Sequence, residues 1–227
     1  MVVDRAYYFD RLYPLQDRVL ELLRQTETGF YLSGGTAASR GYLHHRFSDD
    51  LDLFVNDDRR FGLWADRLVA ALSGRPEWTV EVMLREERFV RIALDASGLL
   101  LKLELVDDVP AHVGAVKDHP ILFRLDSAEN ILANKLTALV DREEPKDLAD
   151  VWGFSCKLGL SLADALVGAQ SKAAGLFAPD VARVLLQAGD DDWGLVRWID
   201  APDPERFVAD LRRLGERLVL VGDRPGG

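Results

Sequence analysis

Two aspartates, Asp50 and Asp52, lie one residue apart in the run DLDLFV at positions 50–55. Acidic and apolar residues alternate in this run, as is typical of a half-buried strand, so both carboxylates should leave one face and Leu51 and Leu53 the other. Two carboxylates this close repel each other unless a cation compensates them. The run is therefore either a solvated edge strand or part of a site for Mg²⁺ or Mn²⁺, which prefer carboxylate oxygens.

A third acid, Glu104, lies in the strongly apolar run LLLKLELV at 99–106. A charged residue in such a run needs a partner, because burying an unpaired charge is costly. Lys102 lies two residues earlier on the same predicted face and could form an ion pair with Glu104. We favour metal ligation by Glu104, because Asp50 and Asp52 already require a partner.

The chain reads Gly34-Gly35-Thr36 between a predicted strand and a predicted helix. Glycines let a backbone approach a ligand closely, and the start of a helix offers free N–H groups to a phosphate. A Gly-Gly pair on its own is more typical of a simple turn. If a nucleotide binds here, the hydroxyl of Thr36 is expected within reach of its phosphates; otherwise Thr36 caps the following helix.

The elements around these residues follow from apolar periodicity and from turn residues. Strands are predicted at 30–32, 50–55, 78–84, 89–94 and 99–106, and helices at 12–23, 36–45, around 64–72, from 127 onward, and at 146–158, 161–174, 179–188 and 203–220. Pro14 is expected in the first turn of the first helix, and Asp190, Asp191 and Asp192 in a solvated turn. The order indicates an α/β (α+β) protein, with a mixed-sheet domain over 1–115 and an all-α domain over 116–227.

Composition limits the function classes. The chain has 227 residues, a single cysteine and a net charge of −10. It has no apolar run long enough to span a membrane and no recognisable signal peptide, so we expect a soluble, cytoplasmic protein. An acidic chain repels nucleic acid on average. Binding of RNA would therefore need a local basic patch or a metal-filled site.

Two sequence blocks resemble a known family. The string GGTAASRGYLHHRFSDDLDLF resembles the AbiEii/AbiGii toxin branch of the nucleotidyltransferase superfamily, whose fold is of the DNA polymerase β type. The block ENILANKLTALVDREEPKDLADVW at 129–152 is similar to a second motif of that branch. Two departures are visible: the third acid is Glu104 where Asp is commoner, and Ala37-Ala38 follows the GGT where a bulkier apolar residue is usual.

The resemblance implies roles for the second block. Lys135 would contact the phosphates of a bound nucleotide; the alternative is a solvent-facing lysine, the commoner fate of this residue type. The group formed by Lys146, Asp147 and Asp150 would organise Lys135 and Arg142, and one acid, Asp147, could act as a base. From the residues themselves, Arg46 and Ser48 should brace the loop before the acidic strand, with Arg46 also a candidate nucleotide contact. Adjacent histidines, His44 and His45, point apart on a helix and do not form a zinc site together.

The implied function is metal-dependent transfer of a nucleoside monophosphate from an NTP to an acceptor. The resemblance points to RNA, at a tRNA 3′ end, and to a toxin with a cognate antitoxin. The nucleotide would lie in a cleft that the helical domain completes. Two other classes stay open: a small-molecule transferase of the aminoglycoside type, which an acidic cleft would favour, and a non-catalytic binding module on the same fold.

Overall fold

A computed structural model describes residues 4–173 and 175–222, and these fall into two compact units. The first unit contains the residues up to Ala37, Ser48–Pro110 and Ala115–Asp126. The second contains Ala38–Phe47, Ala111–Gly114 and the chain from Ser127 onward. The units are thus interleaved in sequence, whereas the prediction placed one boundary at 115/116. The difference matters most for 38–47, which precedes the acidic strand in sequence but belongs to the helical unit.

The first unit is built on a mixed seven-stranded sheet with the order β3-β4-β5-β2-β1-β7-β6. The strands are β1 Tyr31–Ser33, β2 Leu51–Asn56, β3 Thr79–Arg85, β4 Phe89–Ala96, β5 Leu99–Asp108, β6 Lys117–His119 and β7 Phe123–Leu125. β2 runs parallel to β5 and antiparallel to β1, and β3, β4 and β5 form antiparallel hairpins. The predicted strands are all present. The pair β6 and β7 was not predicted, because its three-residue strands are too short to show a period.

Alternation along the central strands separates an apolar face from a polar one. Buried and half-buried residues alternate along β2 and over most of β4 and β5. The buried face includes Leu51, Leu53, Ile92, Leu103 and Leu105. The same period-2 pattern leaves the acidic residues of these strands on the opposite face. The predicted placement of Asp52 opposite Leu51 and Leu53 is therefore confirmed.

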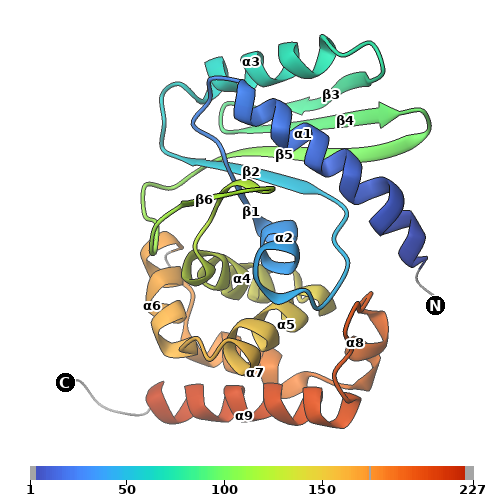
Figure 1. The fold of residues 1–227 in the computed structure, drawn as a ribbon. Helices are drawn as coiled ribbons and strands as arrows, with labels where there is room; N and C mark the ends of the chain where they lie inside the picture. Colours follow the sequence, from blue (N-terminus) through green and yellow to red (C-terminus); the bar gives the residue numbers. More distant parts are fainter. Residues whose placement is uncertain (1–3, 174, 223–227) are drawn as a thin grey trace. The chain divides into compact units, whose positions relative to one another are not determined.

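Two long helices accompany this sheet, α1 Tyr13–Gln25 and α3 Phe61–Ser73, and α1 contacts α3 (Figure 1). The helix containing Pro14 begins earlier than predicted, because the π-helical turn η1 (Tyr7–Leu12) precedes α1 without a break. Pro14 lies in the first turn of α1, as predicted, although η1 extends the helical segment toward the N-terminus. A proline ring clashes with the carbonyl four residues back in an α-helix, and the wider π-turn relieves this clash.

The second unit is helical. Its elements are η2 Ala37–Leu43, which continues the short α2 Gly34–Thr36 of the first unit, then α4 Ala128–Arg142, α5 Pro145–Trp152, η3 Gly153–Lys157, α6 Leu162–Lys172, α7 Ala178–Gln187, α8 Asp190–Leu195 and α9 Pro204–Gly222. Ser127 is the N-cap of α4, as predicted, and its hydroxyl accepts a hydrogen bond from the Asn130 N–H. In Figure 1, α7 lies along α9, and the two pack together.

The acidic run 190–192 was predicted as a turn and instead forms the first turn of α8. Three acids there suit the positive end of the helix dipole, and the carboxylate of Asp192 accepts a hydrogen bond from the Gly189 N–H. Among residues 4–173 and 175–222, no helix is both long and apolar enough to cross a membrane.

Candidate active site

The acidic face of the first unit is organised by the β2–β5 pair. Asp52 on β2 and Glu104 on β5 are direct partners in the parallel register. Since residues in register on neighbouring strands point to the same face, their side chains lie side by side. Asp50 precedes β2 by one residue and is about two-fifths exposed. Three acids from two separate parts of the sequence, positions 50–52 and 104, are thus brought to one surface.

Two cations are paired with these acids. The Lys102 Nζ lies 2.9 Å from Asp50 Oδ2 and 3.2 Å from Glu104 Oε1, so its ammonium lies between the two carboxylates. The Arg91 guanidinium on β4 donates to the same Glu104 oxygen at 2.9 Å. Burial opposes the charge of Lys102, but the carboxylates of Asp50 and Glu104 outweigh it and raise the pKa of the ammonium. The ion pair that the sequence allowed between Lys102 and Glu104 is therefore present.

Gly34 fits tightly against the carboxylate of Asp52. Its backbone has φ of +64°, and a Cβ built there would lie 2.0 Å from Asp52 Oδ2. Ser33, the residue before it, is the antiparallel register partner of Asp52, and its hydroxyl donates to Asp126 Oδ2 at 2.6 Å. Only glycine adopts this left-handed conformation without strain and also has no Cβ to collide with the carboxylate. The Gly34-Gly35 pair is thus required by the close approach of the loop to Asp52.

Thr36 is fully buried, and its hydroxyl is engaged inside the unit. Thr36 Oγ1 donates to the Asp50 backbone carbonyl at 2.5 Å and lies 3.0 Å from Ser48 Oγ. The residue is inside α2, and Ser33 is the N-cap of that helix, so Thr36 does not cap it. This geometry gives Thr36 the role of fixing the backbone of Asp50. The phosphate contact expected of its hydroxyl has no support in this arrangement.

The acidic face suits a hard divalent cation in its donor chemistry. Carboxylate oxygens are the ligands that Mg²⁺ prefers, usually one or two of them completed by waters and substrate phosphates. The ammonium of Lys102 already marks one position where two carboxylates hold a positive charge. Among residues 4–173 and 175–222, no group of three or more His, Cys, Asp or Glu side chains is arranged to hold a metal ion by itself. The case for a cation here therefore rests on the donor chemistry of the acids, with water and substrate as the other ligands.

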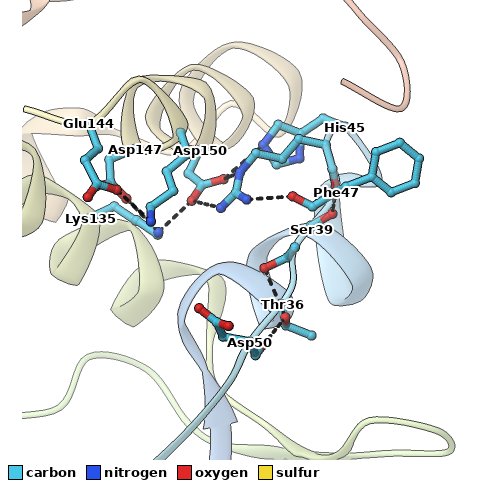
Figure 2. A network of polar contacts seen from close by, with 12 residues as sticks. Thr36, Ser39, His45, Phe47, Asp50, Lys135, Glu144, Asp147 and Asp150 are labelled. Carbon is cyan, nitrogen blue, oxygen red and sulfur yellow. Dashed lines mark hydrogen bonds and ion pairs between the residues drawn. The ribbon is translucent and has the colours of Figure 1, made fainter. Parts of the chain in front are cut away.

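A second charged cluster lies within the helical unit. Lys135 on α4 is buried, and its Nζ lies 2.8 Å from Asp147 Oδ1 and 2.7 Å from Asp150 Oδ2. Figure 2 shows the Lys135 ammonium directed toward these two carboxylates of α5. The alternative of a solvent-facing lysine is therefore wrong. Burial opposes the charge of Lys135, but the two aspartates outweigh it and raise its pKa.

Asp150 joins Lys135 to the segment before the acidic strand. The Arg46 guanidinium donates to both Asp150 oxygens at 2.7 Å. His45 Nε2 lies 3.0 Å from Asp150 Oδ1 (Figure 2). Burial alone would raise the pKa of Asp150, but Arg46, Lys135 and the His45 hydrogen bond hold it well below its usual range. Burial lowers the pKa of His45, although Asp150 acts in the opposite sense. Arg46 thus braces its loop, as predicted, by a buried two-pronged contact to α5.

Asp147 connects Lys135 to the surface of the unit. The half-exposed Arg142 donates to both oxygens of Asp147, at 2.7 and 2.9 Å, while Asp147 itself is buried. The expected organisation of Lys135 and Arg142 by the two aspartates is thus present. Lys146 is not part of this cluster by direct contact, because its ammonium pairs with Glu144 at 2.6 Å.

Two members of these clusters were missed from the sequence. Arg91 could have been found, because it alternates with buried residues in the run FVRIAL and must share a face with the acids of the next strand. His45 carries no such signal. Its partner Asp150 is 105 residues away, and nothing local shows that its ring is fully buried.

Comparisons with known proteins identify the family of the chain. A sequence model of the family described as nucleotidyl transferase AbiEii toxin, type IV toxin–antitoxin system, matches residues 18–155. The match covers the Gly34 loop, the acidic strands and the α4–α5 cluster. No curated protein sequence gives a significant match to the chain.

Two solved structures share the fold. JHP933 from Helicobacter pylori is 18% identical with a TM-score of 0.57, and the match covers 96% of this chain and 93% of that one. MenT4, a nucleotidyltransferase toxin from Mycobacterium tuberculosis H37Rv, is 18% identical with a TM-score of 0.56, covering 95% of this chain and 84% of that one. The family match extends over more than half of the chain and confirms the resemblance seen in its two motifs. The protein described here belongs to the AbiEii family and is a nucleotidyltransferase toxin.

Proposed function

We propose that this protein transfers a nucleoside monophosphate from an NTP to the 3′ end of an RNA, with tRNA as the expected acceptor, and releases pyrophosphate. The observation that carries the proposal is the pairing of Asp52 with Glu104 across two parallel strands, with Asp50 beside them. The close packing of Gly34 against Asp52 adds to it. A rigid row of acids next to a glycine loop is suited to binding a metal-complexed triphosphate.

Asp50, Asp52 and Glu104 are the residues that would hold Mg²⁺ or Mn²⁺. The metal, when bound, would neutralise phosphate charge and stabilise the attacking and leaving oxygens. The protein's own contribution is positional. Thr36 fixes the backbone of Asp50, and the β2–β5 register fixes Asp52 relative to Glu104. The missing side chain of Gly34 lets the loop approach the Asp52 carboxylate closely and so helps to fix its position.

In the helical unit, we assign phosphate binding to Arg142 before Lys135. Arg142 is half-exposed, and its guanidinium is held by Asp147. Lys135 is only 7% exposed and is already paired with two aspartates, so its part in nucleotide binding is to hold Asp147 and Asp150 in place. Lys146 is exposed and is a second candidate contact. In the same way, Arg46 would act through Asp150, and Asp147, with two cationic partners, is poorly suited to act as a base.

The partner is inferred from the family, and the acceptor is our own proposal. A toxin of a toxin–antitoxin pair implies a cognate antitoxin, and MenT4 is described as a nucleotidyltransferase toxin. RNA is the acceptor that we favour. The net charge of −10 supports one rival, a small cationic acceptor of the aminoglycoside type.

The test is incubation of the purified protein with each of the four α-labelled NTPs and Mg²⁺, in parallel with total RNA, with purified tRNA and with an aminoglycoside. We expect label on RNA from one or two of the NTPs, and loss of that label when EDTA is added. Label on the aminoglycoside alone would assign the small-molecule function. Label on no acceptor, with every NTP, would contradict the proposal.

A further inference from the structure

The acidic face contains a cation of its own. Lys102 Nζ is within 3.2 Å of both Asp50 and Glu104, the first and third acids of the row. We propose that Lys102 is a placeholder cation, which neutralises these two carboxylates before metal binds and which the metal must displace. The inference rests on the proposed function, because it takes Asp50 and Glu104 to be metal ligands.

The position of Lys102 fits a placeholder better than a permanent structural ion pair. Its side chain is 41% exposed, against 38% for Asp50 and 19% for Glu104, so the ammonium can reach water directly. Ion pairs at such exposure contribute little to stability, and displacement is therefore easy. Without any cation, Asp50 and Glu104 would repel each other on one face.

Arg91 is a natural comparison within the same site. It also pairs with Glu104, at 2.9 Å, but the structure gives it no contact with Asp50. Arg91 therefore compensates one acid from the neighbouring strand β4, whereas Lys102 contacts both Asp50 and Glu104, two of the residues that would hold the metal. A placeholder in that position makes metal binding an exchange of cations. Its removal should strengthen metal binding, the opposite of what loss of a supporting residue would do.

The experiment measures Mn²⁺ alone, by the electron paramagnetic resonance signal of the free ion, in the full-length protein without nucleotide. We expect Lys102→Met to bind Mn²⁺ roughly three- to tenfold more tightly than wild type, the size expected when two partly exposed ion pairs no longer have to be broken. Lys102→Arg, which keeps the charge, should stay near wild type. Lys117→Met, at an exposed lysine of β6, makes the same change in net charge and should leave the affinity within about twofold.

Thermal melts provide a second measurement that does not depend on catalysis. Without metal, Lys102→Met should melt below Lys117→Met, because Asp50 and Glu104 each lose an ion pair, although Arg91 still pairs with Glu104. Addition of saturating Mn²⁺ should raise the Tm of Lys102→Met more than it raises the Tm of wild type. Arg91→Met should show a smaller increase in Mn²⁺ affinity than Lys102→Met.

The inference is overturned if Lys102→Met binds Mn²⁺ no more tightly than wild type, or if neither protein binds it. Its failure is distinguishable from failure of the proposed function. An active wild type with unchanged affinity in Lys102→Met would remove only the placeholder. Tighter Mn²⁺ binding in Lys102→Met, in a protein that labels no acceptor, would support the placeholder and remove the proposed transfer reaction.

Discussion

Asp52 and Glu104 are direct register partners on the adjacent parallel strands β2 and β5. Strand pairing alone therefore brings together two acids that the sequence separates by about fifty positions. A slip of one residue in either strand would turn that acid into the apolar face among Leu51, Leu53 and Leu103. The hydrophobic pattern that fixes the register of the core thus also fixes the geometry of the proposed metal site.

The contact between Gly34 and Asp52 leads to a prediction about stability. Gly34→Ala should lower the free energy of unfolding by about 1–3 kcal/mol, because φ is +64° and the new Cβ would meet Asp52 Oδ2. It should also reduce transfer, since Asp52 must move. The measurements are urea denaturation and an activity assay.

The control is Gly62→Ala on α3, where an added Cβ meets no atom within 4 Å. Helix propensity should make that variant more stable, by about 0.5–1 kcal/mol. Equal stability and activity of Gly34→Ala and wild type would show that the loop does not need its glycine.

The buried cluster predicts that substitution of Asp150 lowers the free energy of unfolding strongly. Asp150→Asn should cost about 3–5 kcal/mol of stability, because Arg46 and Lys135 would keep buried charges without their shared partner. Asp200→Asn is the matched control: Asp200 is 75% exposed and pairs with Lys157 at 3.2 Å. The Asp200→Asn variant should lose at most about 1 kcal/mol of unfolding free energy. Similar unfolding free energies for the two variants in urea would contradict the account of the cluster.

The same cluster predicts how stability depends on pH. Burial lowers the pKa of His45 in the folded protein below its unfolded value of about 6.5. The unfolded chain therefore takes up this proton first, so the stability contributed by His45 is full above about pH 6.5 and is lost as pH falls toward the folded pKa. The pKa of Asp150 is also lowered, so its contribution is lost only in the acid range, below about pH 4.

We therefore expect the unfolding free energy to fall as pH drops below about 6.5, and His45→Gln to remove much of that slope. The glutamine side chain keeps an amide that can donate to Asp150. Urea denaturation at a series of pH values gives the slope for both proteins. An unchanged slope in the variant would show that His45 is not the group that titrates.

Much of the fold could be predicted, because the strands alternate cleanly and helix α4 has its Ser127 cap. The acidic face followed from period 2 within β2 and β5. Local sequence patterns could not predict which residues far apart in the sequence are in contact. Arg46 and Asp150 are 104 positions apart, and the burial of Thr36 depends on its contact with the Asp50 backbone. The membership of residues 38–47 in the helical unit likewise depends on contacts with residues far away in the sequence.

The central claim is that the Asp50–Asp52–Glu104 row carries nucleotidyl transfer. It is tested most directly by the initial rate at which label from an α-labelled NTP is joined to RNA by wild type and by Asp52→Asn, at saturating Mg²⁺. Asp52 lies on the half-buried polar face, so its variant should keep the wild-type Tm within a few degrees. We predict a rate reduced at least about a thousandfold, as expected when a metal ligand or a preorganised charge is removed. A correctly folded Asp52→Asn protein that retains more than a tenth of the wild-type rate would contradict the account.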